Sequence, residues 1–152
     1  MNGRHRILNM ISGEPLDSLP FMPITMMFAG DCSGIPYGEY ARDHRKLAEA
    51  QLRIAETFDV DYVSVISDPA REASDLGASI EWFDNQPPAI VESHALIDDK
   101  AKLAKLEVPD PLAGPRMSDR VAAAAMLAER AGATHIVEGW IEGPCAMAAD
   151  LR

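Results

Sequence analysis

The stretch VDYVSVISDPAREASDLG, residues 60–77, contains an apolar run that delivers a serine and an acid before a proline. Its apolar residues are continuous rather than alternating, which is typical of a parallel strand covered on both faces. Pro69 suits the first position of a short helix, and Gly77 suits its stop. The stretch therefore predicts a strand over 61–67 and a helix after it, with Ser67 and Asp68 at the carboxyl end of the strand.

The same order of strand and helix extends to both sides of this stretch. The sequence predicts further strands over 21–28 and 134–140, a loop over 30–38, and a hairpin built from 78–82 and 89–92. Helices are predicted over 4–12, 39–58, 100–106, 116–131 and from 143 onward. The helix over 116–131 is expected to pack on the sheet through Met117, Val121, Ala124, Ala128 and Ala131. Strand–helix alternation of this kind indicates an α/β protein with right-handed crossovers.

Composition excludes several classes of function. The 152 residues carry a formal net charge of −10 and contain no basic stretch, which argues against a nucleic-acid binder. No apolar run is long enough for a membrane span, and the start of the chain does not resemble a signal peptide. Cys32 and Cys145 lie far apart without metal-binding spacing, so we expect two free thiols and a cytoplasmic protein.

Acidic residues lie at the carboxyl end of each of the three predicted parallel strands. In such folds ligands bind where the carboxyl ends of the strands meet. The residues at these ends are Met27, Phe28, Ala29, Gly30 and Asp31 for the first strand, Ser67 and Asp68 for the second, and Glu138, Trp140 and Glu142 for the third. If the strands are neighbours, these acids converge on one mouth, where they suit a donor-rich ligand or proton transfer.

Structural roles compete with these functional ones. Asp68 precedes a helix, and on the residues alone an N-cap is favoured over catalysis. Glu138 and Glu142 are equally well explained as solvated loop charges. His44 lies on the apolar face of its helix, where a core histidine is more common than a ligand. No spacing of His and Cys encodes a metal site within these residues.

Three stretches resemble the uroporphyrinogen decarboxylase superfamily, which also contains corrinoid- and cobalamin-dependent methyltransferases. RILNMISGEPLDSLPFMPI resembles its opening helix and first strand, and FDVDYVSVISDPAREASDLGASIEW its second strand with the Ser-Asp end. IVEGWIEGPCAMAADLR resembles a later strand with its Gly-Pro turn into a helix. The resemblance extends in order over nearly all of residues 1–152.

The resemblance implies a (β/α)8 TIM barrel, a fold that needs ~250 residues. Residues 1–152 supply about three of its βα units, so we expect one incomplete domain, the N-terminal part of a barrel. Such a part ends with an open sheet edge. We therefore expect an oligomer, or a partner that carries the remainder of the barrel, and little activity from these residues alone.

The resemblance also gives the residues roles. In the decarboxylases the acid that matches Asp68 points into the barrel and accepts hydrogen bonds from pyrrole N–H groups, so the resemblance makes Asp68 the expected catalytic residue. Substrate contacts are expected from Phe28, Gly30, Ser67, Glu138, Trp140 and Glu142.

One departure bears on the branch of the superfamily. The decarboxylases carry two arginines after the first strand that bind substrate carboxylates, in a stretch that here reads MFAGD. Met27 and Asp31 stand where the arginines belong, and an acid repels a polycarboxylate. The resemblance therefore favours the methyltransferase branch, with a corrinoid protein as partner and a zinc ion bound by residues outside this chain. A decarboxylase of porphyrin biosynthesis and a non-catalytic tetrapyrrole-binding or assembly piece are the alternatives.

Overall fold

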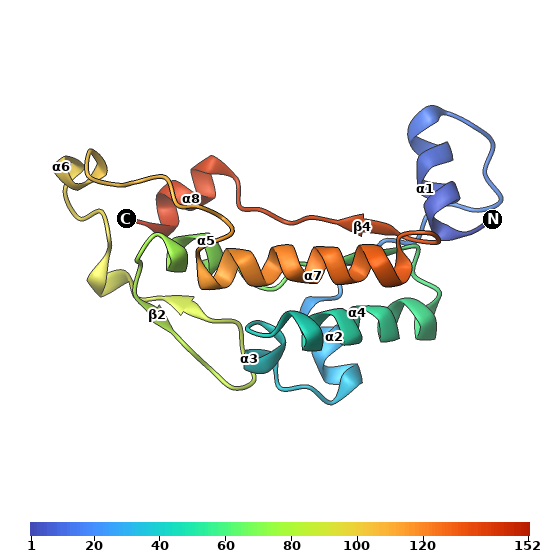
Figure 1. Cartoon of the computed structure of the whole chain (residues 1–152), viewed down its shortest axis with the longest axis horizontal. Coiled ribbons are helices and arrows are strands. Elements are labelled where there is room, and N and C mark those ends of the chain that lie inside the picture. Colours follow the sequence, from blue (N-terminus) through green and yellow to red (C-terminus); the bar gives the residue numbers. More distant parts are fainter.

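The computed structural model describes residues 1–152, in which short strands alternate with helices (Figure 1). The helices are α1 (Gly3–Ser12), α2 (Met26–Ser33), α3 (Tyr37–Tyr40), α4 (His44–Phe58), α5 (Ala70–Asp75), α6 (Lys100–Leu103), α7 (Pro115–Ala131) and α8 (Pro144–Asp150). The strands are β1 (Tyr62–Ser64), β2 (Ile80–Glu81), β3 (Ala89–Ile90) and β4 (Ile136–Glu138), and a 3₁₀ turn covers Glu92–His94. None of the helices combines the length and the apolar character that crossing a membrane requires.

A pair of parallel strands forms the centre of the fold. Val63 of β1 lies opposite Val137 of β4, and Ser64 lies opposite Glu138. Helices α4 and α7 pack side by side against this pair, and the core between them includes Leu47, Val63 and Leu127, all without exposed surface. The crossover from β1 to β4 contains the hairpin and three helices, because parallel strands cannot be joined by a tight turn.

Local chemistry explains where the two long helices begin. Asp43 caps α4 by accepting a hydrogen bond from the backbone N–H of Arg45 at 2.8 Å. Helix α7 begins with Pro115, which has no N–H to leave unpaired, and the carboxylate of Asp75 in α5 accepts from the N–H groups of Arg116 and Met117. The cap of α7 is therefore a tertiary contact, which ties α5 to α7.

Several predicted elements are present with small shifts in their ends. The first helix is α1, which ends at Gly13 in the left-handed region with φ of 72°. The strand over 61–67 is confirmed, although only Tyr62–Ser64 pair as β1 and the rest continues as buried extended chain. The hairpin is confirmed as the antiparallel pair β2 and β3. The last predicted strand and helix are β4 and α8.

The predicted first strand over 21–28 is wrong. Residues 21–25 form no ladder, and Met26–Ser33 form helix α2, so the predicted loop begins later than expected. Pro20 and Pro23 have no N–H to donate to a strand partner. The N–H of Ser64 in β1, which a neighbouring strand would satisfy, instead donates to Oε1 of Gln51 at 3.2 Å.

Two predictions about helices also need correction. The helix predicted over 39–58 is interrupted between α3 and α4, and Phe58 at its end is exposed. Helix α7 packs through Arg116, Arg120, Ala123, Leu127 and Ala131. Of the five residues predicted for that face only Ala131 is buried, because the helix is rotated by about one position to admit the two arginines.

Candidate functional site

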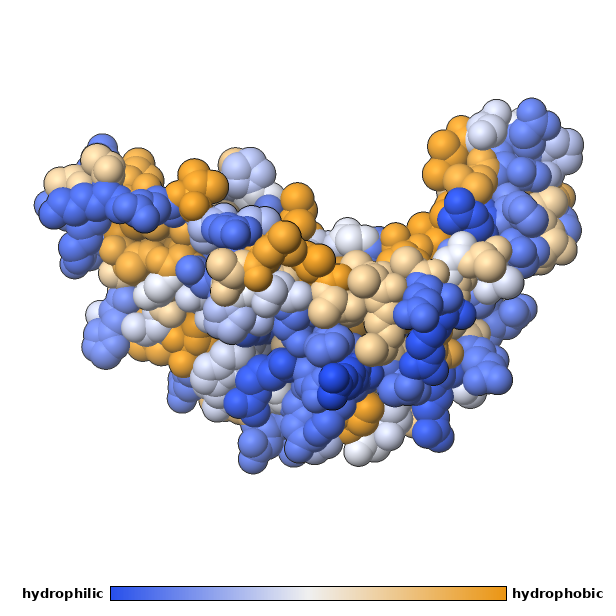
Figure 2. All heavy atoms as spheres, viewed as in Figure 1, coloured by the Kyte–Doolittle hydropathy of each residue, from blue (hydrophilic) through white to orange (hydrophobic).

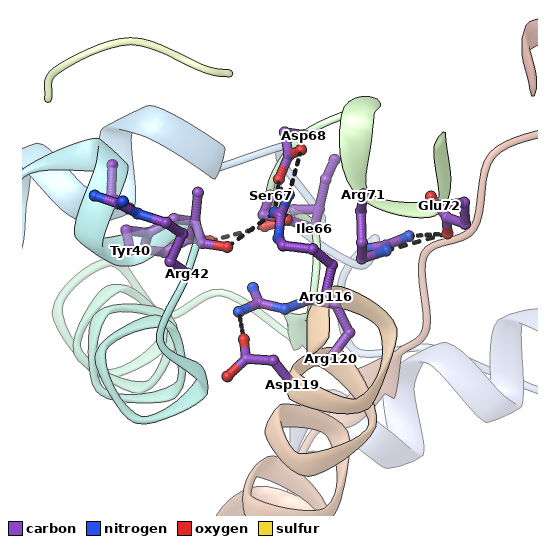
Figure 3. A network of polar contacts seen from close by, with 12 residues as sticks. Tyr40, Arg42, Ile66, Ser67, Asp68, Arg71, Glu72, Arg116, Asp119 and Arg120 are labelled. Atoms are coloured by element: carbon purple, nitrogen blue, oxygen red, sulfur yellow. Dashed lines mark hydrogen bonds and ion pairs between the residues drawn. The ribbon is translucent and has the colours of Figure 1, made fainter. Parts of the chain in front are cut away.

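Asp68 lies at the carboxyl end of the extended chain that continues β1, with no exposed side-chain surface (Figure 3). Its Oδ2 accepts hydrogen bonds from Nη2 of Arg116 at 2.6 Å and from the hydroxyl of Ser67 at 2.7 Å. Oδ1 accepts one longer bond, from Nη1 of Arg116 at 3.3 Å. The carboxylate is therefore held in a buried, charge-assisted arrangement, with fewer and longer hydrogen bonds at Oδ1 than at Oδ2.

Arg116 reaches this position from the first turn of α7. Its Nη2 also donates to the carbonyl of Ala41 at 3.0 Å, and its guanidinium lies 4.9 Å from the centre of the Trp82 ring. Arg42 lies 5.0 Å from the same ring. Burial lowers the pKa of Arg116, and the nearby charges of Arg120 and Arg71 act in the same direction, whereas Asp68 opposes the shift.

Two further arginines are buried close to this pair (Figure 3). Arg71 of α5 binds Glu72 and donates to the backbone carbonyl of Trp140, which connects α5 to the segment after β4. Arg120, one turn after Arg116, pairs with Asp119. Nη1 of Arg71 and both Nε and Nη1 of Arg120 are buried without a hydrogen-bond partner. Each of the three guanidinium groups thus has its own acid, although some of their N–H groups lack a hydrogen-bond partner.

The structure brings some of the predicted site residues together and separates others. Ser67 contacts Asp68 directly, whereas Glu138 lies further back along the sheet and accepts a hydrogen bond from the hydroxyl of Ser64 at 2.7 Å. Glu138 is therefore half-buried and paired rather than a solvated loop charge. Trp140 and Glu142 line a groove of about 550 Å³ together with Arg71.

Phe28 and Gly30 do not join this group. Both lie on α2, where the ring of Phe28 packs 5.4 Å from that of Phe58 and Gly30 is buried beside Ile35 and Tyr37. Their expected place at a strand end depended on the first strand, which is absent. No hydrogen bond or ion pair joins Asp68 to Glu138 or Glu142, and only the carbonyl of Trp140 is linked to the end of β1, through Arg71.

The capping role that the residues favoured for Asp68 is wrong. Pro69 is the N-cap residue of α5, and no side chain caps that helix. His44 is half-buried, and its Nδ1 lies 2.9 Å from Oδ1 of Asp119, which agrees with a structural role at the edge of the core.

Sequence reasoning missed the arginines that surround Asp68. A signal was available, since Arg116 and Arg120 share the helical period of Ala123 and Leu127, and an arginine on an apolar face needs a buried acid. The sequence did not reveal which acid, because Arg116 and Asp68 are separated by 48 residues.

No three His, Cys, Asp or Glu side chains come together in a way that would hold a metal ion. Cys32 and Cys145 are both free and exposed, on α2 and α8. The arrangement at Asp68 offers instead a buried carboxylate fixed by a guanidinium, which can hold a donor or stabilise positive charge.

The chain matches a known protein family and is similar in fold to several solved structures. A family model described as uroporphyrinogen decarboxylase (URO-D) matches residues 2–152. A methyltransferase from Methanosarcina mazei has a similar fold, with a TM-score of 0.82 and 22% sequence identity, over 99% of this chain and 45% of that chain. No curated protein sequence matches. The chain thus spans less than half the length of that methyltransferase, and its fold is the expected α/β class, part of a (β/α)8 barrel.

Proposed function

The chain belongs to the uroporphyrinogen decarboxylase family, and from this premise we propose that it is the N-terminal part of an enzyme that transfers a methyl group between a methylated substrate or thiol and a corrinoid protein. The similarity in fold to a methyltransferase supports the proposal. The reaction belongs to the completed barrel rather than to residues 1–152.

One observation carries the choice of branch. Where the resemblance expects two arginines for substrate carboxylates, α2 presents Met27 and Asp31, and both side chains are exposed. Asp31 forms no ion pair that would cancel its charge, and the whole chain carries a net charge of −10. Neither residue can bind a carboxylate as an arginine does, whereas a methyl donor or a thiol places no such demand on these positions.

Asp68 is the residue to which we assign a role in binding. Arg116 and Ser67 fix its Oδ2, and Oδ1 accepts only the 3.3 Å bond from Arg116. Because this side chain has no exposed surface, a ligand donor reaches Oδ1 only when the residues that cover it move, and it then binds without displacing the counter-ion. In the proposal it orients the ligand at the carboxyl end of β1, and Arg116 positions Asp68.

Zinc and a corrinoid belong to the proposal only for the completed protein. The residues present do not fit a zinc site, since no suitable group of three ligands occurs among residues 1–152. Zinc bound elsewhere would supply an activated thiolate. No step in the proposal passes through a metal held by this chain.

A decarboxylase is the second candidate, and the arginines near Asp68 favour it. Arg71 and Arg120 keep buried N–H groups without partners, as an arginine pair for substrate carboxylates would. Each already has its own acid, Glu72 and Asp119, which weakens this reading. To bind a substrate with eight carboxylates, both guanidinium groups would have to break their ion pairs with these acids.

The test measures both reactions with the native protein purified from the organism that carries the gene. Methylcobalamin with a thiol probes demethylation, and uroporphyrinogen probes decarboxylation, each with wild-type protein and with Asp68→Asn. We expect demethylation that Asp68→Asn slows at least tenfold, and no decarboxylation. Decarboxylation without demethylation would replace the proposal by the second candidate. Binding of a tetrapyrrole without either reaction would favour a non-catalytic role.

A further inference from the structure

A groove of about 550 Å³ lies between α5, α7, α8 and the segment that follows β4. Apolar surface gathers at this end of the molecule, where α5 and α8 lie (Figures 1 and 2). The charged residues that line the groove are Arg71, Glu72, Arg120 and Glu142. The other lining side chains are apolar apart from the indole of Trp140, so the groove has the composition of a small-molecule site, with apolar walls and few polar groups.

The two arginines of this groove are buried and still have N–H groups to donate. Arg71 is 1% exposed and Arg120 is 5% exposed. Nη1 of Arg71 and both Nε and Nη1 of Arg120 have no hydrogen-bond partner. A buried donor without a partner costs free energy, and almost all such groups in folded proteins are paired. The two arginines therefore suit a ligand that accepts hydrogen bonds.

The charges around the groove favour a neutral ligand over an anion. Each of the three guanidinium groups drawn in Figure 3 has its own carboxylate partner, so this network is balanced in charge. Glu142 adds a carboxylate to the wall of the groove, and the whole chain has a net charge of −10. An anion would meet this excess of negative charge, whereas an uncharged oxygen can accept from the unpaired N–H groups without that repulsion.

We propose that the groove binds a neutral, mainly apolar small molecule whose oxygen, such as that of a carbonyl group, accepts hydrogen bonds from Arg71 and Arg120. Met117, Val121 and Trp140 line the groove and contact the apolar body of the ligand. The donors are buried, so the oxygen reaches them only when lining side chains shift. The inference rests on the groove and its arginines and not on the proposed reaction.

Three benzene derivatives of similar size test the proposal. Acetophenone carries a neutral carbonyl group, ethylbenzene has a methylene group in its place, and benzoate carries a negative charge. Their dissociation constants are measured by NMR titration of the full-length gene product, in which arginine is labelled with ¹⁵N. The Nε–H resonance of Arg120, identified by its absence in Arg120→Lys, reports on one of the unpaired donors. The Nε–H of Arg6, which donates to Asp17 at the other end of the molecule, is the reference (Figure 1).

We expect acetophenone to bind about tenfold more tightly than ethylbenzene, because a hydrogen bond to a charged group has about that effect on affinity. Benzoate should bind more weakly than acetophenone. Acetophenone should shift the Arg120 Nε–H resonance and leave that of Arg6 unchanged. Val121→Trp, which fills the groove from a position that is 45% exposed, should abolish binding. Glu129→Trp, on the exposed surface about two turns further along α7 and outside the groove, should not.

The other outcomes would overturn the proposal. Equal or tighter binding of ethylbenzene would mean a purely apolar surface, and tighter binding of benzoate would mean an anion site. Binding that leaves the Arg120 resonance unchanged, or that survives Val121→Trp, would lie elsewhere on the protein. If none of the probes binds up to its solubility limit, water is the partner of these N–H groups. Should Arg120→Lys fail to fold, the ranking of the three probes and the effect of Val121→Trp decide between these outcomes.

Discussion

At the end of β1 two opposite charges are withdrawn from water together. The Asp68 side chain has no exposed surface and that of Arg116 has 8%. Desolvating each ion costs free energy, which their short contact and the bonds from Ser67 and to Ala41 offset. Each group is therefore stable in its place only while the other is present.

Asp68→Asn should lower the free energy of unfolding by about 3–5 kcal/mol, because it leaves the Arg116 guanidinium buried without a counter-ion. Urea unfolding followed by circular dichroism measures the loss. Arg116→Met, alone and combined with Asp68→Asn, completes the cycle, and the double variant should lose clearly less than the sum of the single losses. Additive losses, or a loss below about 1 kcal/mol for Asp68→Asn, would mean that the pair behaves as a surface ion pair.

The three tyrosines should make the fold sensitive to alkali. Burial raises the pKa of Tyr37, Tyr40 and Tyr62 above the ordinary 10.0, that of Tyr62 to about 12, where the Glu138 charge is a second cause. The folded state thus favours the neutral phenol, so this stability is complete below pH 10 and is lost as the pH rises towards 12. Tyrosinate absorbance should appear together with the loss of circular dichroism. Titration near pH 10 with the fold intact would contradict the burial of these groups.

The sequence was sufficient to place Asp68 but not its partner. The apolar run ending at Ser67 predicted a strand end, which depends only on local residues. The contact with Arg116 depends on the rotation of α7, and a rotation of about one position exchanges one face of the helix for another. Small residues such as Ala123 and Ala124 lie on either side of that boundary, so apolar periodicity alone did not distinguish the two faces.

The hairpin of β2 and β3 is connected to the site through its tip. The N–H of Gly38 in α3 donates to the carbonyl of Asp84 at 2.8 Å, and Trp82 lies against Arg42 and Arg116. A Cβ at Gly38 would collide with the carbonyl oxygen of Phe83. The position of Trp82 therefore depends on a glycine in another element.

Gly38→Ala should displace the hairpin tip and expose Trp82 further, because the backbone of Phe83 and Asp84 leaves no space for a methyl group. In a Trp140→Phe background, Trp82 fluorescence should shift to the red and become more accessible to a quencher. Gly139→Ala is the matched control, since a Cβ there meets nothing within 4 Å. Equal spectra for the two glycine variants would show that the tip does not rest on α3.

The cap of α7 provides a second test of how elements are joined. Asp75→Ala removes the carboxylate that accepts from Met117 N–H at 2.7 Å and from Arg116 N–H at 3.1 Å. The expected loss is about 1–2 kcal/mol in the free energy of unfolding, as for other capping residues. Asp31→Ala, on the exposed surface of α2, should change it by less than about 0.5 kcal/mol. A similar effect of both variants would contradict the tertiary cap.

Elements whose ends have a local sequence signature were predicted well. The strand predicted over 21–28, which depended on its neighbours in the fold, was not. Gly13 and the Pro115 start of α7 mark helix ends through their own backbone chemistry. The segment over 21–28 has the apolar composition of a strand, but Gln51 binds the N–H that such a strand would pair with. Whether a strand pairs with this edge of β1 depends on tertiary contacts, which composition does not encode.

At the scale of the whole molecule, the chain is one side of a barrel. Its core lies between the parallel strands and helices α4 and α7, and the molecular surface is hollowed between two raised ends (Figures 1 and 2). A barrel removes sheet edges by closing on itself, and this piece leaves both of its flanks open. In the proposed function, the reaction depends on groups that the remainder of the barrel brings next to Asp68.

Amide hydrogen exchange of β4 tests this account most directly. Exchange is measured for the amides of residues 136–138 in two samples, the isolated chain of residues 1–152 and the native protein purified from the organism that carries the gene. The amides of α4 serve as the internal reference. We predict that the amides of β4 exchange at least a hundredfold more slowly in the native protein, because a parallel strand covers the free edge of β4. The exchange rates of the α4 amides should change much less. Equal exchange of β4 in both would contradict the central claim that this chain is one part of a closed barrel.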